Sequence, residues 1–203
     1  MVYKICFVST HGTGKTALAA LTEGELKRRD INAKYISEMA TSAIERGLPI
    51  NEGTTIEAQL WILYQQFAEE LVYSGKRSTS SNYEVIICDR GPDNYCYLER
   101  RVGEHSHALS VTLGHLEHFP YNQIYLIPII EERIAPGEGI RSINPEFQQE
   151  MDTHIRQFLA KHKIAFHELP RPHNDDNYRN EWVKIIVNQT LQDLDKPEHL
   201  YMR

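Results

Sequence analysis

Eight residues near the N-terminus, Ser9-Thr10-His11-Gly12-Thr13-Gly14-Lys15-Thr16, have the types and spacing of a phosphate-binding loop. Two glycines allow a tight turn that directs backbone N–H groups at one anion. The side chain of Lys15 can reach terminal phosphates, and the Thr16 hydroxyl can ligate Mg²⁺. The usual pattern begins with glycine where this chain has Ser9. We expect phosphates to be bound by His11, Gly12, Thr13, Gly14, Lys15, Thr16 and Ala17.

The elements on either side of this loop are those that a phosphate-binding loop needs. An apolar run over Val2–Val8 predicts a buried strand, and a helical pattern follows from Lys15 to about Arg29. The start of that helix adds unpaired N–H groups and the positive end of the helix dipole.

Asp89 and Arg90 directly follow another apolar run, Val85–Cys88, which predicts a third strand. Open α/β sheets bind ligands at the carboxyl ends of their strands. A carboxylate at Asp89 can hold Mg²⁺ together with Thr16, or instead cap the next helix. Arg90 can clamp an anionic substrate with its planar fork, or instead form a structural ion pair.

Glu38 has the equivalent place after a predicted second strand at Ala33–Ser37. In this position it can accept the proton of a substrate hydroxyl. Capping the short helix at Met39–Arg46 and joining the metal shell are its alternatives. Gln59 lies on a long predicted helix that Thr54 would cap, and it can read a base or an amide by paired hydrogen bonds, unless it is only structural.

Residues 128–143 form a charged stretch rich in proline and glycine, without periodicity, which predicts an irregular lid. Arginines on a closing lid can stabilise the charge of phosphoryl transfer and exclude water. Arg141 is the favoured candidate because Gly137 and Gly139 give its approach flexibility, and Arg133 is the second. A solvated charged loop is the alternative.

Strand and helix patterns alternate along the whole chain, which predicts crossover units on a parallel sheet. Beyond the elements above, we expect helices near 93–101 and 109–118, a fourth strand at 124–127, a helix at 145–161, a fifth strand at 164–169 and a closing helix at 180–194. A polar linker at 74–81 lies between elements of one sheet, so we expect a single domain over 1–203 with a lid at about 128–143.

Composition narrows the function classes. The chain has 203 residues and a formal net charge of −6, which disfavours an extended nucleic-acid partner. No run is long and apolar enough for a membrane span, and the first strand begins too early for a signal peptide. Cys6, Cys88 and Cys96 lack metal-like spacing and are expected to be free thiols, typical of a cytoplasmic protein. Four histidines between 105 and 118 lack a completing ligand set for a metal.

Taken together, the chain resembles the P-loop nucleoside and nucleotide kinases. It is most similar to the group that includes the ribosylnicotinamide kinase domain of bifunctional NAD-synthesis regulators, and more distantly to deoxynucleoside and thymidylate kinases. The residues that carry the resemblance are the loop ending Gly12-Thr13-Gly14-Lys15-Thr16, Glu38, Asp89-Arg90, Gly139-Ile140-Arg141-Ser142 and Asn144-Pro145-Glu146-Phe147-Gln148. Ser9 and Glu138 depart from the pattern of the group.

The resemblance implies an α/β P-loop NTPase fold in three layers, with a parallel five-stranded sheet of order 2-3-1-4-5. It implies ATP and Mg²⁺ as cofactors, Glu38 as the base, Asp89 and Arg90 at metal and substrate, Gln59 at the acceptor base, and lid arginines matching Arg141 and, less closely, Arg133. The adenine would lie near residues 170–174, where Arg171 can stack on it. Whether the chain forms a homodimer is left open.

Three functions are compatible with these residues. The first is a kinase that transfers the γ-phosphoryl group of ATP to a small acceptor, such as a nucleoside, a nucleotide or a related metabolite. The second is a regulatory ATPase without a small acceptor; the guanine signature Asn-Lys-x-Asp is absent from the sequence, which disfavours a GTPase switch. The third, a polynucleotide end kinase, is disfavoured by the acidic net charge.

Overall fold

The computed structural model describes residues 2–76, 82–130, 144–172 and 177–196. Within these residues the chain forms a parallel five-stranded sheet in the order β2-β3-β1-β4-β5, as predicted. The strands are β1 (Tyr3–Val8), β2 (Ala33–Ile36), β3 (Val85–Cys88), β4 (Gln123–Leu126) and β5 (His167–Glu168). Every residue of β1 and β3 is buried, which explains their continuous apolar runs.

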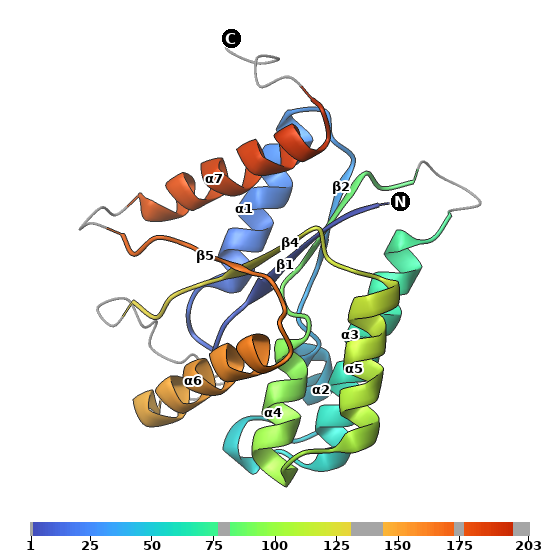
Figure 1. Cartoon of the computed structure of the whole chain (residues 1–203), viewed down its shortest axis with the longest axis vertical. Coiled ribbons are helices and arrows are strands. Elements are labelled where there is room, and N and C mark those ends of the chain that lie inside the picture. The colour runs from blue at the N-terminus through green and yellow to red at the C-terminus, as the bar shows by residue number, and fades with distance from the viewer. Residues whose placement is uncertain (1, 77–81, 131–143, 173–176, 197–203) are drawn as a thin grey trace.

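Helices cover both faces of the sheet, so the fold has three layers (Figure 1). One face carries α1 (Lys15–Arg28) and α7 (Tyr178–Asp193). The other carries α2 (Ala40–Glu45), α3 (Ile56–Ser74), α4 (Asp93–Val102), α5 (Ser106–His118) and α6 (Pro145–Lys161). A short 3₁₀ turn, Asn51–Gly53, precedes α3. Each face has its own apolar core, and β1 lies between them.

Some boundaries differ from the sequence prediction. The fifth strand is limited to His167–Glu168, because the ladder with β4 pairs only these two residues. The cap of α3 is Thr55, whose hydroxyl accepts a hydrogen bond from the N–H of Ala58, and not Thr54. Helix α5 begins at Ser106, three residues earlier than expected. Most of the predicted lid lies outside the described residues.

The prediction of free thiols is confirmed, and the helices give one further finding. The three cysteines are buried free thiols. Across the described residues, no helix has the length and apolar character needed to cross a membrane.

Candidate active site

The loop between β1 and α1 folds as its glycines predict. Gly12 and Gly14 both have positive φ, 75° and 87°, which side chains rarely adopt. Gly14 is also the N-cap residue of α1, so the first turn of the helix opens directly onto the loop. Open N–H groups and the helix dipole therefore face one position, which is how backbone atoms bind phosphate.

Lys15 is held by the loop itself. Its ammonium donates to the carbonyl oxygens of Ser9 at 3.2 Å and Thr10 at 2.7 Å, and to the Ser9 hydroxyl at 3.0 Å. The Ser9 hydroxyl also bonds to that of Thr13 at 2.6 Å. Burial, and next the positive charge of Arg90, lower the pKa of Lys15 to about 8. The residue that departs from the usual pattern thus supplies a third acceptor for the lysine.

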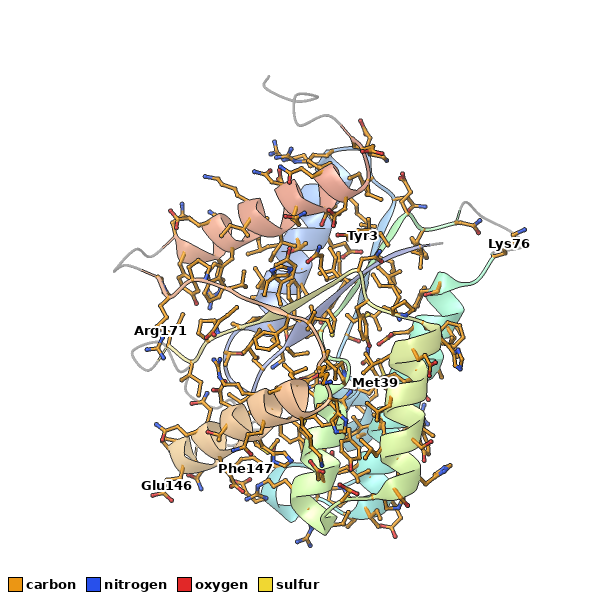
Figure 2. The ribbon with its side chains drawn as sticks, viewed as in Figure 1. Tyr3, Met39, Lys76, Glu146, Phe147 and Arg171 are labelled. Atoms are coloured by element: carbon orange, nitrogen blue, oxygen red, sulfur yellow. The ribbon has the colours of Figure 1, made fainter. Side chains whose placement is uncertain are left out.

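Two elements that are distant in sequence support the loop. From α6, Gln148 donates to the His11 carbonyl at 2.8 Å, and Phe147, labelled near the start of α6 in Figure 2, stacks on the His11 ring at a centroid distance of 5.0 Å. From α7, the guanidinium of Arg179 lies so close to Gly14 that an added Cβ would meet it at 3.3 Å. Neither support was predicted from the sequence; the similarity of 144–148 to kinases was the only signal for the first.

Thr16 and Asp89 meet beside the loop, and the residues fit a magnesium site. Asp89 is fully buried, accepts a hydrogen bond from the Tyr35 hydroxyl at 3.0 Å and interacts with the Thr16 side chain. Its Oδ1 has no hydrogen-bond partner among the described residues, which leaves that oxygen available as a ligand. Burial raises the pKa of Asp89 to about 6, although Lys15 opposes the shift.

No cluster of three or more His, Cys, Asp or Glu residues in the described part of the chain could hold a metal by itself. One carboxylate and one hydroxyl suit Mg²⁺, which usually takes its other ligands from water and phosphates. Of the four histidines, His105 caps α5 by accepting from the N–H of Ala108, and His115 belongs to a buried ion-pair cluster.

Glu38 and Arg90 form an ion pair beside the loop, where Arg90 Nη1 also donates to the Ser9 carbonyl at 3.3 Å. The Nε of Arg90 lies 2.9 Å from Glu38 Oε2, and its Nη1 lies 2.9 Å from Asp93 Oδ2. The guanidinium also covers the ring of Tyr97 at 4.6 Å from the centroid. Asp93 was not predicted as part of the site, although it lies one turn beyond Arg90 in sequence.

One cleft is lined both by the phosphate loop and by the ion pair of Glu38 and Arg90. The space between its walls, including the open mouth, is about 660 Å³. The walls are residues from the loop, the β2–α2 segment, α3 and the β3–α4 region: His11, Gly12, Thr13, Gly14, Lys15, Thr16, Glu38, Ala40, Ile50, Asn51, Gln59, Ile62, Arg90, Asn94 and Tyr97. Among predicted site residues, the structure thus brings the phosphate loop together with Glu38, Gln59 and Arg90.

Gln59 lines the cleft with its amide partly engaged, and several other predicted residues lie away from the cleft. Gln59 Nε2 donates to the Thr54 hydroxyl at 2.8 Å, so part of its amide is already used. Ala17 is exposed on α1 and does not line the cleft. Arg171 is exposed at the outer edge of the molecule, on the segment after β5 (Figure 2), and it does not line the cleft either. Arg133 and Arg141 lie outside the described residues.

A three-layer parallel sheet with a glycine-rich loop at the carboxyl end of its central strand defines a P-loop nucleotide-binding protein. The family model described as "AAA domain" matches residues 4–176, and the chain belongs to this family. No curated protein matches the sequence significantly.

Solved structures with this fold include NadR proteins and a thymidylate kinase. NadR protein in complex with NR has a TM-score of 0.72 at 16% identity, covering 98% of this chain and 54% of that one. NadR in complex with NAD and AMP-PNP has a TM-score of 0.68 at 13% identity, covering 98% and 52%. Thymidylate kinase from Ehrlichia chaffeensis has a TM-score of 0.63 at 17% identity, covering 94% and 99%.

At these identities the likeness concerns the fold, and the chain spans about half the length of the NadR chains. The similarity to the ribosylnicotinamide kinase group and to thymidylate kinases that the sequence predicted is confirmed at this level.

Proposed function

We propose that the chain is an ATP-dependent kinase that transfers the γ-phosphoryl group to a small acceptor, which is a nucleoside, a nucleotide or a related metabolite. The observation that carries this proposal is the cleft that the phosphate loop shares with an ion pair of the half-buried Glu38 and the buried Arg90. A site that only binds a nucleotide does not need the ion pair of Glu38 and Arg90 beside the phosphate loop. The structures of NadR with NR and with AMP-PNP, and of a thymidylate kinase, support the same class.

Each residue has a role in this proposal. The loop amides and Lys15 hold the phosphates of ATP, and Thr16 and Asp89 hold Mg²⁺, which neutralises phosphate charge when bound. Glu38 aligns the acceptor hydroxyl and takes its proton, and Arg90 keeps Glu38 in position at 2.9 Å. Because positioning and electrostatic stabilisation provide most of the catalysis in phosphoryl transfer, fixed groups along this cleft suffice.

Several predicted roles stay proposals. Arg141, and second Arg133, would bring positive charge to the transferred group from the lid. Gln59 would contact the acceptor base with the part of its amide that Thr54 does not use. Arg171 would stack on adenine, although Arg179 lies nearer to the loop at Gly14.

Acceptor-dependent release of ADP tests the proposal. ADP formation is measured with Mg²⁺ and ATP, alone and with each member of a panel of nucleosides and nucleotides. At least one acceptor should raise the rate above the control without acceptor, and Lys15→Ala should reduce the stimulated rate to background. Lys184→Ala, at an exposed position on α7, is the matched control and should behave as wild type.

A regulatory ATPase without a small acceptor is the second candidate, and the family description "AAA domain" favours it. That function predicts ADP release that no acceptor stimulates but that Lys15→Ala still abolishes. No ADP release under any condition would contradict both candidates.

A further inference from the structure

We propose that the acceptor is a nucleoside-like alcohol that carries no phosphate group. This inference rests on the proposed kinase function and narrows its substrate class. The inference follows from the position of the Arg90 guanidinium. It lines the cleft, but it is already ion-paired with the carboxylates of Glu38 and Asp93.

Arg90 has partners on all three of its nitrogens. Nε donates to Glu38 at 2.9 Å, Nη1 to Asp93 at 2.9 Å and to the Ser9 carbonyl at 3.3 Å, and Nη2 to the Tyr97 hydroxyl at 3.4 Å. Only 6% of the residue is exposed. Planar bidentate recognition of a phosphate needs a guanidinium edge that faces the ligand. The edge of Arg90 is already occupied by protein groups.

Asp93 cannot easily give up this contact. It is fully buried, and its second oxygen accepts a hydrogen bond from the Gly91 N–H at 2.8 Å. It also lies in the first turn of α4, where the helix dipole stabilises a carboxylate. An incoming phosphate would therefore have to displace Glu38, and it would meet a group of one cation and two anions whose net formal charge is −1.

Within the described residues, the other cation that lines the cleft does not change this balance. Apart from Arg90, Lys15 is the only described lining residue with a lysine or arginine charge, and it donates to Ser9 and Thr10 within the loop that would bind ATP. The remaining walls of the acceptor side are amide and apolar side chains: Ala40, Ile50, Asn51, Gln59, Ile62 and Asn94. Such walls suit a sugar and a base that are neutral or positively charged, and not a phosphate dianion.

Matched pairs of acceptors test this inference. The panel contains nucleosides with neutral bases and one with a cationic pyridinium base, each beside its own 5′-monophosphate, and the measured quantity is kcat/KM for acceptor-dependent ADP release. We expect the best nucleoside to exceed its monophosphate by roughly 10²-fold or more, as leaving a charged group without a partner costs a large factor in binding. Stimulation by monophosphates alone, or at equal efficiency, overturns this inference but leaves the kinase function standing. Stimulation by neither overturns both.

Glu38→Gln tests the cause directly, through binding and not through turnover. The substitution keeps the size of the side chain and removes one of the two charges that face Arg90. In thermal-shift or calorimetric titrations, the Kd ratio of monophosphate to nucleoside should fall by about tenfold relative to wild type. Glu45→Gln, exposed on α2, is the control and should leave the ratio unchanged. An unchanged ratio in Glu38→Gln would show that charge at Arg90 does not set the preference.

Discussion

Asp89 carries its negative charge in a place that disfavours it. The side chain is fully buried, and its pKa is raised from 3.8 to about 6, chiefly by loss of water. A carboxylate in such a place costs stability unless a cation joins it. The residue is better explained by the ligand that it would bind than by any contribution to folding.

Replacing this carboxylate should therefore stabilise the protein without ligand. Since the pKa is higher in the folded state, wild type loses stability as the pH rises from about 4 to about 6, and the penalty is complete above that. Asp89→Asn removes it, with a gain on the order of 1–3 kcal/mol at pH 7.5 that vanishes towards pH 4. Urea unfolding of the variant and of wild type at both pH values measures the difference.

Asp30→Asn serves as the control for this prediction. Asp30 is exposed, and its positive φ of 57° suits asparagine. The free energy of unfolding of the Asp30→Asn variant should therefore stay within about 0.5 kcal/mol of that of wild type. Asp89→Asn should also lose magnesium-dependent turnover. A variant that is less stable than wild type at pH 7.5 would contradict the view that this charge is held at a cost.

Residues of the site differ in how far sequence could predict them. The phosphate loop was predictable because its signal is local, in one run from Ser9 to Thr16. The pairing of Glu38 with Arg90 joins residues 52 positions apart, and the bond from Gln148 to His11 spans 137. Both depend on how strands and helices pack, so spacing could place these side chains near one edge of the sheet but could not give their partners.

At the scale of elements, α3 connects the cleft to a buried ionic cluster. Gln59 and Ile62, near its start, line the cleft, and Glu70, near its end, is fully buried. Glu70 pairs with Lys4 of β1 at 2.8 Å and with His115 of α5 at 3.0 Å. Burial alone would raise the pKa of Glu70, but these two partners outweigh it and the pKa is lowered. The cluster joins α3 to the sheet and to α5.

Removing one charge from this cluster should destabilise the fold strongly. Glu70→Gln leaves the Lys4 ammonium, which is only 4% exposed, without its anion, at an expected cost of about 3–5 kcal/mol. Adding Lys4→Met should recover part of that loss, because no unpaired charge then remains buried. Chemical unfolding of the single and double variants measures both effects.

The neighbouring Glu69→Gln is the control for the cluster, since Glu69 is only partly buried and accepts from Gln65 on the same helix. Its effect should stay within about 0.5 kcal/mol. If Glu70→Gln loses less than about 1 kcal/mol, the pair with Lys4 is not what fixes α3 against the sheet.

The edge of the sheet shows why element boundaries were harder to predict than elements. The run from Ile164 to Leu169 reads as a strand, yet only His167 and Glu168 pair with β4. Ile164 and Phe166 pack instead against the core on the face of α6. Apolar composition fixes which residues are buried, but pairing needs backbone contact along the whole run, and the ladder with β4 joins only Tyr125 to His167 and Leu126 to Glu168.

For the whole molecule, strand order and layers were predictable because alternating strands and helices, right-handed crossovers and one loop motif leave few arrangements. The acceptor and the oligomeric state were not predictable, since both depend on surfaces that no local pattern marks.

The formal net charge of −6 opposes binding of an anionic nucleotide at long range. Nucleotide affinity must then come from the local field of the loop amides, the α1 N-terminus and Lys15.

The protein should therefore be stabilised by magnesium ATP in spite of its acidic charge. A ligand at one hundred times its Kd adds about 2.7 kcal/mol to the stability of the folded state. For a chain of this size, that corresponds to an increase in Tm of about 5–10 °C. The shift should be retained with AMP-PNP, should be much smaller with AMP because the loop binds the outer phosphates, and should be lost in Lys15→Ala but kept in Lys184→Ala. Equal shifts for ATP and AMP would place the affinity in the base and not in the loop, and the absence of any shift in folded protein would rule out nucleotide binding at this site.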